Sequence, residues 1–536
     1  MVRRQVGTRG GSSLPSEPAD LWGAGATGSS VTFLDPSTAY RTKQSTGVRP
    51  TTFVAGSLLV RGRDPRTWEA LRQAVAEADF TIDTSLGLGR DVLDAAHLQP
   101  EHHQALARVW VERIGLVPDP DREDDVFRPL DTWRLLQSYR AKVGDDPERL
   151  ADVGLEHPVS RGARPNPLTN PHPLTNPHPF TNPHSEGVAL YAQAGWGGRQ
   201  PVNWLGPAPR PTLAPGARRP TVAVLDSGIG RHPWLTDEHV TRDPEVLGRL
   251  IGMTPGPGDA ETTGSGNRFT GELAPDAGHG TFIAGLLRQA CPDAHLLDVQ
   301  LFRGDGEVTE SDMLEAVQLL ALRHLLALEG RGHEGAPYEP LDVLSLSLGY
   351  YHEQPGDAAF DALLAGPLDL LGSFGVAVVA SAGNDATNRP SYPAAFAPVD
   401  GSLGGDATRV HVTAVGALNP DGTVALFSND GPWVRFWRPG AALVSTLPTT
   451  FDGSAEARNV LVGERGEIRA ALDPDDFTSG FAVWSGTSFA APVLAGQLAQ
   501  GLLESWQATG PDPSPRETVA RVRTVLAGLP ALEGRP

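Results

Sequence analysis

The sequence predicts an α/β fold with a mostly parallel central sheet covered by helices, preceded by a small α/β or helical N-terminal domain. Two observations predict this arrangement. A proline-rich repeat separates an early segment, which has its own apolar runs, from the rest of the chain. After the repeat, helix-like stretches alternate with short and nearly continuous apolar runs, at residues 221–225, 294–302, 341–349 and 375–384. Strands that are buried on both faces of a parallel sheet show such runs.

The N-terminal third divides into a polar segment and a small domain. Residues 1–50 are rich in Gly, Ser, Thr and Pro, so we expect them to be disordered. Residues 51–155 contain enough apolar periodicity for a compact unit, which we interpret as a prosegment-like or regulatory domain. Its expected elements are a strand at 51–60, a helix at 65–78 that is opened by Pro65, and helices at 105–114 and 133–142.

Residues 156–184 are predicted to be a linker. Within them "NPLTNPHPLTNPHPFTNPH" (166–184) repeats six residues, and its frequent prolines forbid a helix and disfavour a sheet. His172, His178 and His184 could in principle chelate a metal. Nothing in the spacing brings the three rings together, so a solvated linker is favoured.

Composition limits the function classes. The 536 residues carry 44 Lys and Arg against 64 Asp and Glu, a formal net charge of −20, which argues against nucleic acid or an anionic membrane as a partner. The first residues lack the apolar region of a secretory signal, and no window has the length of a transmembrane helix. We therefore expect a cytoplasmic protein, with non-classical export as the alternative. The single cysteine, Cys291, excludes an internal disulfide and is expected to be a buried structural thiol.

The stretch "WSGTSFAAPVLAG" (484–496) places Ser488 at the head of an expected helix. A serine there is most often only a helix cap. Here Gly486 lets another chain segment approach, and Pro492 is tolerated near the helix start. A hydroxyl at the positive end of a buried helix suits a nucleophile that also stabilises an oxyanion, provided that a base lies nearby.

Two other positions offer a base and a residue to orient it. "VAVLDSGIG" ends a buried strand at Asp226, where a carboxylate either caps the turn or acts in catalysis. "GHGTFIAGLL" places His279 between two glycines at the head of an apolar helix. A lone histidine is usually structural or solvated, but these glycines remove bulk around the imidazole, so a functional and a structural histidine both stay open here.

These motifs, in the order Asp226, His279, Ser488, resemble those of the subtilisin-like serine proteases (subtilases) over residues 185–530. "AVLDSGI", "GHGTFIAG" and "SGTSFAAPVLAG" match the three motifs of that family, and "ASAGND" matches at Asn384. The resemblance implies a subtilisin-like three-layer catalytic domain. It also implies that Ser488 is the nucleophile, His279 the general base, Asp226 its orienting partner and Asn384 an oxyanion-hole donor.

The resemblance also implies where a peptide binds. "SLSLG" (345–349) matches the strand on which these enzymes lay their substrate, and "SAG" before Asn384 would lie on the other side of the peptide. The expected substrate-binding residues are Ser347, Leu348, Gly349, Ser381, Ala382 and Gly383. No cofactor is expected, and no metal ligands are assigned because the calcium loops of the family are not located in the sequence. Asp385 is either a specificity residue that favours Lys or Arg, or a solvated loop acid.

The function implied is a serine endopeptidase that cleaves a peptide or protein through an acyl-enzyme. Two alternatives stay open: a catalytically silent subtilase-fold binding module, and a protease kept latent until a signal or regulatory partner acts on the N-terminal region. A prosegment would be removed by a cut between about residues 155 and 190, whereas a permanent regulatory domain would stay attached. Two insertions, at 236–273 and 451–477, are expected to frame the cleft.

Overall fold

The computed structural model describes residues 31–532, except 43–46, 86, 121–129, 162–190, 196, 215, 255–258, 260, 265–268, 303–307, 334, 354–361, 400–401, 455–459 and 511–513. The histidine repeat lies outside the described residues. Within them, no helix combines the length and the apolar character that crossing a membrane would need.

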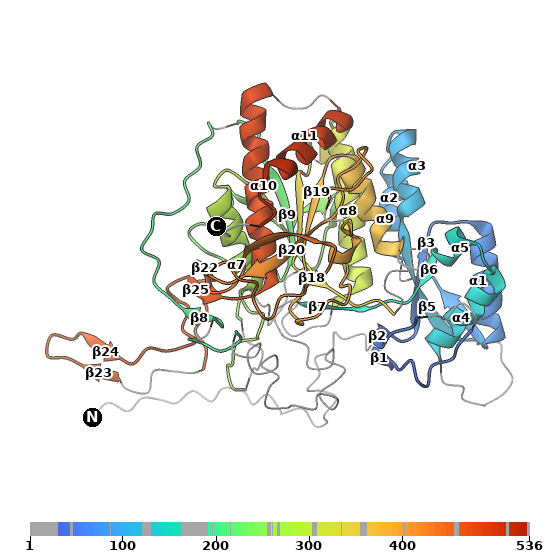
Figure 1. Ribbon diagram of the computed structural model, residues 1–536, viewed down its shortest axis with the longest axis horizontal. Helices are drawn as coiled ribbons and strands as arrows, with labels where there is room; N and C mark the ends of the chain where they lie inside the picture. The colour runs from blue at the N-terminus through green and yellow to red at the C-terminus, as the bar shows by residue number, and fades with distance from the viewer. Residues whose placement is uncertain are drawn as a thin grey trace, which may run out of the picture.

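A central sheet of seven strands forms the core of the larger domain (Figure 1). Every neighbouring pair in it is parallel, as the continuous apolar runs predict. The four predicted runs each supply one of its strands. In spatial order the strands are β10 (Val240–Arg242), β13 (His295–Gln300), β9 (Thr221–Asp226), β17 (Val343–Leu346), β19 (Ala377–Ser381), β20 (Thr413–Leu418) and β21 (Val434–Pro439).

Helices cover both faces of this sheet and make three layers. Strand β9 shows why: Val222 and Val224 belong to one apolar cluster and Ala223 and Leu225 to another. The first cluster includes α7 (His279–Ala290), α10 (Thr487–Thr509) and α11 (Pro515–Gly528). The second includes α8 (Glu310–Leu328) and α9 (Ala362–Ser373) on the opposite face (Figure 1). The prediction of a three-layer α/β domain is confirmed.

Short elements surround the sheet. A three-stranded sheet consists of β22 (Leu443–Thr446), β25 (Phe481–Trp484) and β8 (Gln200–Pro201). The insertion at 451–477 carries the hairpin β23 (Val460–Val462) and β24 (Ile468–Ala470), which extends away from the body of the molecule (Figure 1). Two further hairpins are β11 (Glu245–Val246) with β12 (Arg249–Leu250) and β15 (Gly332–His333) with β16 (Ala336–Pro337).

The N-terminal domain is of the α/β kind. Its four-stranded antiparallel sheet, in the order β4-β5-β3-β6, packs against two helices around a separate apolar cluster. In chain order these elements are β3 (Ser57–Arg61), α1 (Pro65–Glu77), β4 (Phe80–Asp83), β5 (Val111–Pro118), α4 (Thr132–Val143) and β6 (Val153–Gly154). This β-α-β-β-α-β order is the split βαβ motif. The short helices α2 (Arg90–Ala95), α3 (Pro100–Val109) and α5 (Pro147–Leu150) lie in its connections.

Three local expectations differ from the structure. The expected strand at 51–60 is split into β2 (Thr51–Val54) and β3, because Gly56 turns the chain with a φ of 85°. The expected helix at 105–114 ends at Val109 and continues as strand β5. Residues 31–34, expected to be disordered, form β1, because this strand pairs with the apolar strand β2.

The predicted linker also differs at its start. Immediately after β6, residues Pro158–Arg161 form strand β7, which lies antiparallel between β14 (Val308–Thr309) and β18 (Leu348–Gly349). Val159 is buried in the same apolar cluster as Val308 and Leu348. The N-terminal region therefore contacts the larger domain through strand pairing and through a shared apolar cluster.

Candidate active site

Asp226 ends the central strand β9 at the carboxyl edge of the parallel sheet, where ligands of such sheets gather. Its side chain is almost completely buried. Its Oδ1 accepts hydrogen bonds from the Ser227 backbone N–H at 2.8 Å and from the Ser227 hydroxyl at 3.1 Å. These donors fix the orientation of the carboxylate.

His279 is the first residue of α7, and the glycines on both sides of it are required by the packing. Gly278 adopts a φ of 82°, and a Cβ there would lie 2.4 Å from Leu447. A Cβ on Gly280 would lie 2.1 Å from the carbonyl oxygen of Gly228, in the turn that follows Asp226. The glycines thus allow the start of α7 to approach the end of β9, as the motif predicts.

Asp226 and His279 form the central contact of the site. The Asp226 Oδ1 lies 2.7 Å from the His279 Nδ1, and both side chains are buried. A carboxylate at this distance holds the proton on Nδ1, so that Nε2 is the basic nitrogen of the neutral ring. The imidazole also packs against the rings of Trp484 and Phe489, with centroids 5.6 and 5.1 Å away.

Ser488 is the second residue of α10 and is buried, with the aromatic neighbour Phe489 against the His279 ring. Its Oγ lies 3.4 Å from the carbonyl oxygen of Ser347, and the Ser347 hydroxyl donates to the Ser488 carbonyl oxygen at 2.9 Å. The start of α10 is therefore anchored to the chain just before β18. Helices α7 and α10 pack so closely that a Cβ on Gly496 would lie 2.6 Å from the Cβ of Ala290.

Asn384 is buried beside the start of α10. Its Oδ1 accepts hydrogen bonds from the Thr487 backbone N–H at 2.9 Å and from the Thr487 hydroxyl at 2.8 Å. Because two donors hold the carbonyl oxygen, the amide N–H groups are available to another acceptor. The Nδ2 atom of Asn384 lies 3.5 Å from the position that a Cβ of Gly486 would take. Gly486 is the N-cap of α10, so the amide lies next to the N-terminus of that helix, two residues before Ser488.

The expected substrate-binding residues form two groups with different surroundings. Leu348 and Gly349 form β18, and their backbone pairs with β7 of the same chain. The strand expected to accept a substrate is therefore already paired. The other group consists of Ser381, the last residue of β19, and of Ala382 and Gly383, which follow it and directly precede Asn384. Among the described residues this group makes no strand pairing with β7.

Asn429 holds this second group in place. Its Nδ2 donates to the Ala382 carbonyl at 3.0 Å, its backbone N–H donates to the Gly383 carbonyl, and its Oδ1 accepts from the Asp385 N–H. The Asp385 carboxylate is half-buried and accepts a hydrogen bond from the Tyr351 hydroxyl at 2.5 Å. It is therefore not the solvated loop acid that one of the two expectations described.

Glu261 is a buried carboxylate close to Asp226 and His279 that no sequence motif indicated. Its two oxygens accept hydrogen bonds from the hydroxyls of Ser227, which follows Asp226, and of Thr281, two residues after His279. Burial raises the pKa of Glu261 well above its ordinary value, and the charges of Asp226 and Asp259 add to this effect. Its position in the acidic insertion gave no motif by which it could be found.

Strand β14 was missed as well. Val308 and Thr309 pair with β7 on the side opposite β18, so the two strands enclose it. The sequence signal there is weak, since two residues precede helix α8 and Thr309 is also its N-cap.

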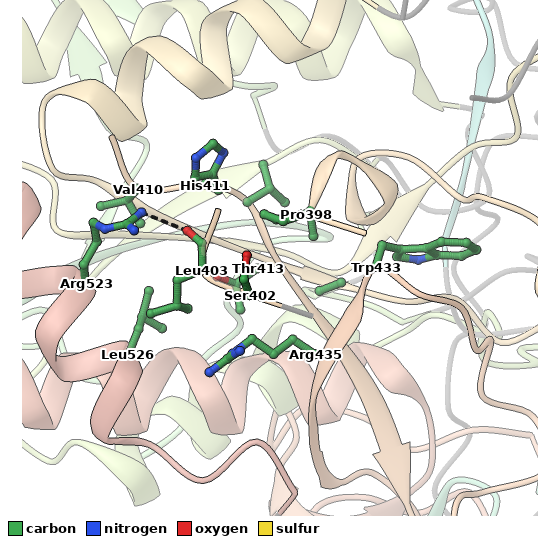
Figure 2. A pocket seen from close by; sticks show the side chains of 13 residues that line it. Pro398, Ser402, Leu403, Val410, His411, Thr413, Trp433, Arg435, Arg523 and Leu526 are labelled. Atoms are coloured by element: carbon green, nitrogen blue, oxygen red, sulfur yellow. Dashed lines mark hydrogen bonds between the residues drawn. The ribbon is translucent and has the colours of Figure 1, made fainter. Parts of the chain in front are cut away.

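A pocket shown in Figure 2 lies elsewhere, between helix α11, the start of β20 and the described residues of the loop that precedes β20. Arg523 reaches across it and donates to the carbonyl oxygens of Leu403 and Gly404 at 2.8 and 3.0 Å. None of the expected site residues lines it. Its arginine contacts tie α11 to the neighbouring loop, which is a structural role.

A three-layer α/β domain that carries Asp226, His279 and Ser488 in this order is subtilisin-like. The sequence profile of Peptidase_S8, the subtilase family, matches residues 217–518, more than half of the chain. The chain therefore belongs to the subtilase family.

Known relatives share part of the chain. The serine protease AprX of Bacillus subtilis (strain 168) is 27% identical over 320 residues, which are 55% of this chain and 59% of AprX. Subtilisin BL of Lederbergia lenta is 29% identical over 236 residues, which are 42% of this chain and 66% of that protein. The chain thus spans less than two thirds of the length of either relative. The crystal structure of fervidolysin from Fervidobacterium pennivorans is 18% identical, with a TM-score of 0.42, over 87% of this chain and 57% of that chain.

Proposed function

We propose that the protein is a serine endopeptidase that hydrolyses peptide bonds in peptides or proteins. The observation that carries the proposal is the buried 2.7 Å contact between Asp226 and His279 at the carboxyl edge of the sheet, beside the helix start that bears Ser488. Membership of the subtilase family supports it.

The chemistry follows from these groups. His279 Nε2 takes the proton of the Ser488 hydroxyl while Oγ attacks the carbonyl carbon of the substrate. Asp226 keeps the imidazole in the required tautomer and stabilises the imidazolium. The imidazolium then gives its proton to the leaving amine, the C–N bond breaks, and an acyl-enzyme remains. Water, deprotonated by the same histidine, attacks this ester and releases the acid.

The developing oxyanion needs donors on its other side. The amide N–H of Asn384 and the backbone N–H of Ser488 at the start of α10 have the right chemistry. A single donor of this kind is worth about 3 kcal/mol in the transition state. Because Thr487 holds the Asn384 carbonyl oxygen, the donor is oriented before the substrate arrives.

We further propose that the N-terminal region keeps the enzyme latent. Strand β7 supports this, because it pairs with β18 next to Ser347, whose carbonyl oxygen contacts the Ser488 hydroxyl. A peptide substrate that adds as a strand between β14 and β18 would need the backbone N–H and C=O groups that now pair with β7. A cut after β7, within the expected window of about residues 155 to 190, would leave the N-terminal domain with β7 as a removable inhibitor. A permanent tether is the alternative.

One comparison tests both proposals. Purified wild-type chain and Ser488→Ala are incubated side by side, their N-termini are sequenced, and both are treated with a fluorophosphonate probe that labels activated serines. A peptidase is labelled only when Ser488 is present, whereas a silent binding module is not labelled at all. Self-processing gives a new N-terminus in the wild type alone. If both proteins stay full length while the wild type cleaves peptides, the tethered-domain alternative replaces the prosegment.

A further inference from the structure

A second cluster of chemically active side chains lies where the N-terminal region meets the catalytic domain. His157 comes from the segment between β6 and β7, and His352 and Glu353 follow β18. All three side chains are buried, Glu353 completely. None of them has a part in the chemistry proposed for Ser488, and the sequence places His157 far from the other two.

The three side chains present their ligand atoms within the span of one metal ion. His157 Nε2 lies 3.0 Å and His352 Nε2 lies 3.5 Å from Glu353 Oε2, and the ligand atoms are all within 4.8 Å of one another. Tetrahedral zinc with bonds of about 2.0–2.1 Å holds its ligand atoms about 3.4 Å apart. The two separations from Glu353 Oε2 lie close to this value, and side-chain adjustments would bring the two histidine nitrogens, at most 4.8 Å apart, to it.

The surroundings of His157 are those of a metal-bound histidine. Its other ring nitrogen, Nδ1, lies 2.7 Å from Glu310 Oε2, and the Tyr350 hydroxyl donates to Glu310 Oε1 at 2.7 Å. The Tyr350 ring also stacks on the imidazole, with centroids 4.9 Å apart. A carboxylate on the far nitrogen fixes the tautomer and the ring plane and makes Nε2 the ligand.

Protonation of His157 competes with metal binding at this site. Burial alone lowers the pKa of His157, but its hydrogen bonds to Glu310 and Glu353 raise the pKa to about 10. Arg140 adds positive charge 3.5 Å from Glu353 Oε1. An ion-pair cluster without metal is therefore a complete alternative, and an experiment has to separate the two.

We propose that His157, His352 and Glu353 bind one divalent ion of the zinc class, with Glu310 orienting His157. Two histidines and a carboxylate are nitrogen and oxygen ligands that suit zinc better than calcium or magnesium. The ion joins the segment directly before β7 to the loop directly after β18. On the proposed function, it therefore fastens the inhibitory strand in the cleft.

The test uses the full chain without an affinity tag, in the Ser488→Ala background so that no self-cleavage occurs. His172, His178 and His184 are changed to Asn, because the repeat could itself bind metal. Zinc bound after dialysis against low-micromolar ZnCl₂ is measured by mass spectrometry, and Co²⁺ is added to the apo-protein to record its visible absorption. We expect one equivalent of zinc, a tetrahedral Co²⁺ spectrum, and a rise of several degrees in the melting temperature with zinc.

Two variants locate the ion. His352→Asn is expected to lose the bound zinc and the zinc-dependent rise in melting temperature. His97→Asn is the matched control, since His97 is exposed and has a φ of 47°, a conformation that Asn tolerates well. It is expected to keep the ion.

The proposal is overturned if the parent chain binds no zinc and gives no Co²⁺ spectrum, or if His352→Asn retains the full equivalent. If His352→Asn does not fold, the bound zinc and the Co²⁺ spectrum of the parent chain alone test the proposal. Because every protein in the test lacks the Ser488 hydroxyl, the outcome does not depend on peptidase activity, and either proposal can fail without the other.

Discussion

Shortening Val159 should open the active site of the intact chain. Val159 of β7 is buried, pairs with Val308 of β14 and belongs to the same apolar cluster as Leu348 of β18. Val159→Ala removes two carbon atoms that are buried only while β7 lies in the cleft. At about 0.8 kcal/mol per buried CH₂ the loss is about 1.6 kcal/mol before any cavity is counted. The fraction of molecules with an open cleft should therefore rise about 15-fold.

The rate at which a fluorophosphonate labels the full-length band measures this fraction, because the probe reaches Ser488 only when the cleft is open. Early time points on a denaturing gel keep any self-processed product separate. Val519→Ala is the matched control: Val519 is equally buried, but in helix α11 away from the cleft. Equal labelling rates for Val159→Ala and the wild type would refute the role of β7. An equal increase in Val519→Ala would show that loss of overall stability, rather than release of the strand, causes the labelling.

Three further outcomes are expected. Ser488→Ala should retain its fold by circular dichroism but lose peptide hydrolysis, and near-wild-type turnover would disprove the assignment. Asn384→Ala should lower kcat by about a hundredfold or more with little change in KM, since its amide serves the transition state; a change mainly in KM would place it in ground-state binding. Glu261→Gln should become more stable relative to the wild type as pH rises. The folded-state pKa of Glu261 is raised, so its contribution to stability is complete below about pH 4.5 and is lost as pH rises through that raised value. Melting temperatures of both proteins from pH 5 to 9 check this, and a constant difference would contradict it.

The sequence predicts best what depends on neighbouring residues. The apolar runs that became β9, β13, β17 and β19 are buried on both faces, so their composition alone indicates a parallel sheet. The glycines around His279 are equally informative, because a Cβ at either of them would collide with the turn after Asp226 or with Leu447. At these two positions the tertiary packing requires glycine, and the sequence motif shows glycine, so the motif is a direct sign of the packing.

Contacts between distant segments were beyond such reasoning. Strand β7 begins with Pro158 inside a region whose prolines indicate a linker, and it becomes a strand only because β14 and β18 supply its partners. Glu261 lies in an insertion without any periodic pattern, and it acquires its role from the hydroxyls of Ser227 and Thr281. His157 and Glu353 likewise meet only in the folded chain.

The position of Ser488 at the start of α10 has a consequence for when the site can form during synthesis of the chain. Helix α10 packs on α7 and on strands β9, β17, β19, β20 and β21, so the serine has no defined position until that core exists. Synthesis runs from the N-terminus, and domains generally fold in that order. A growing chain on the ribosome thus contains β7 and its partner strands β14 and β18 before Ser488 is added. If Ser488 is the nucleophile, as proposed, peptide hydrolysis becomes possible only after the catalytic core has been synthesised and folded.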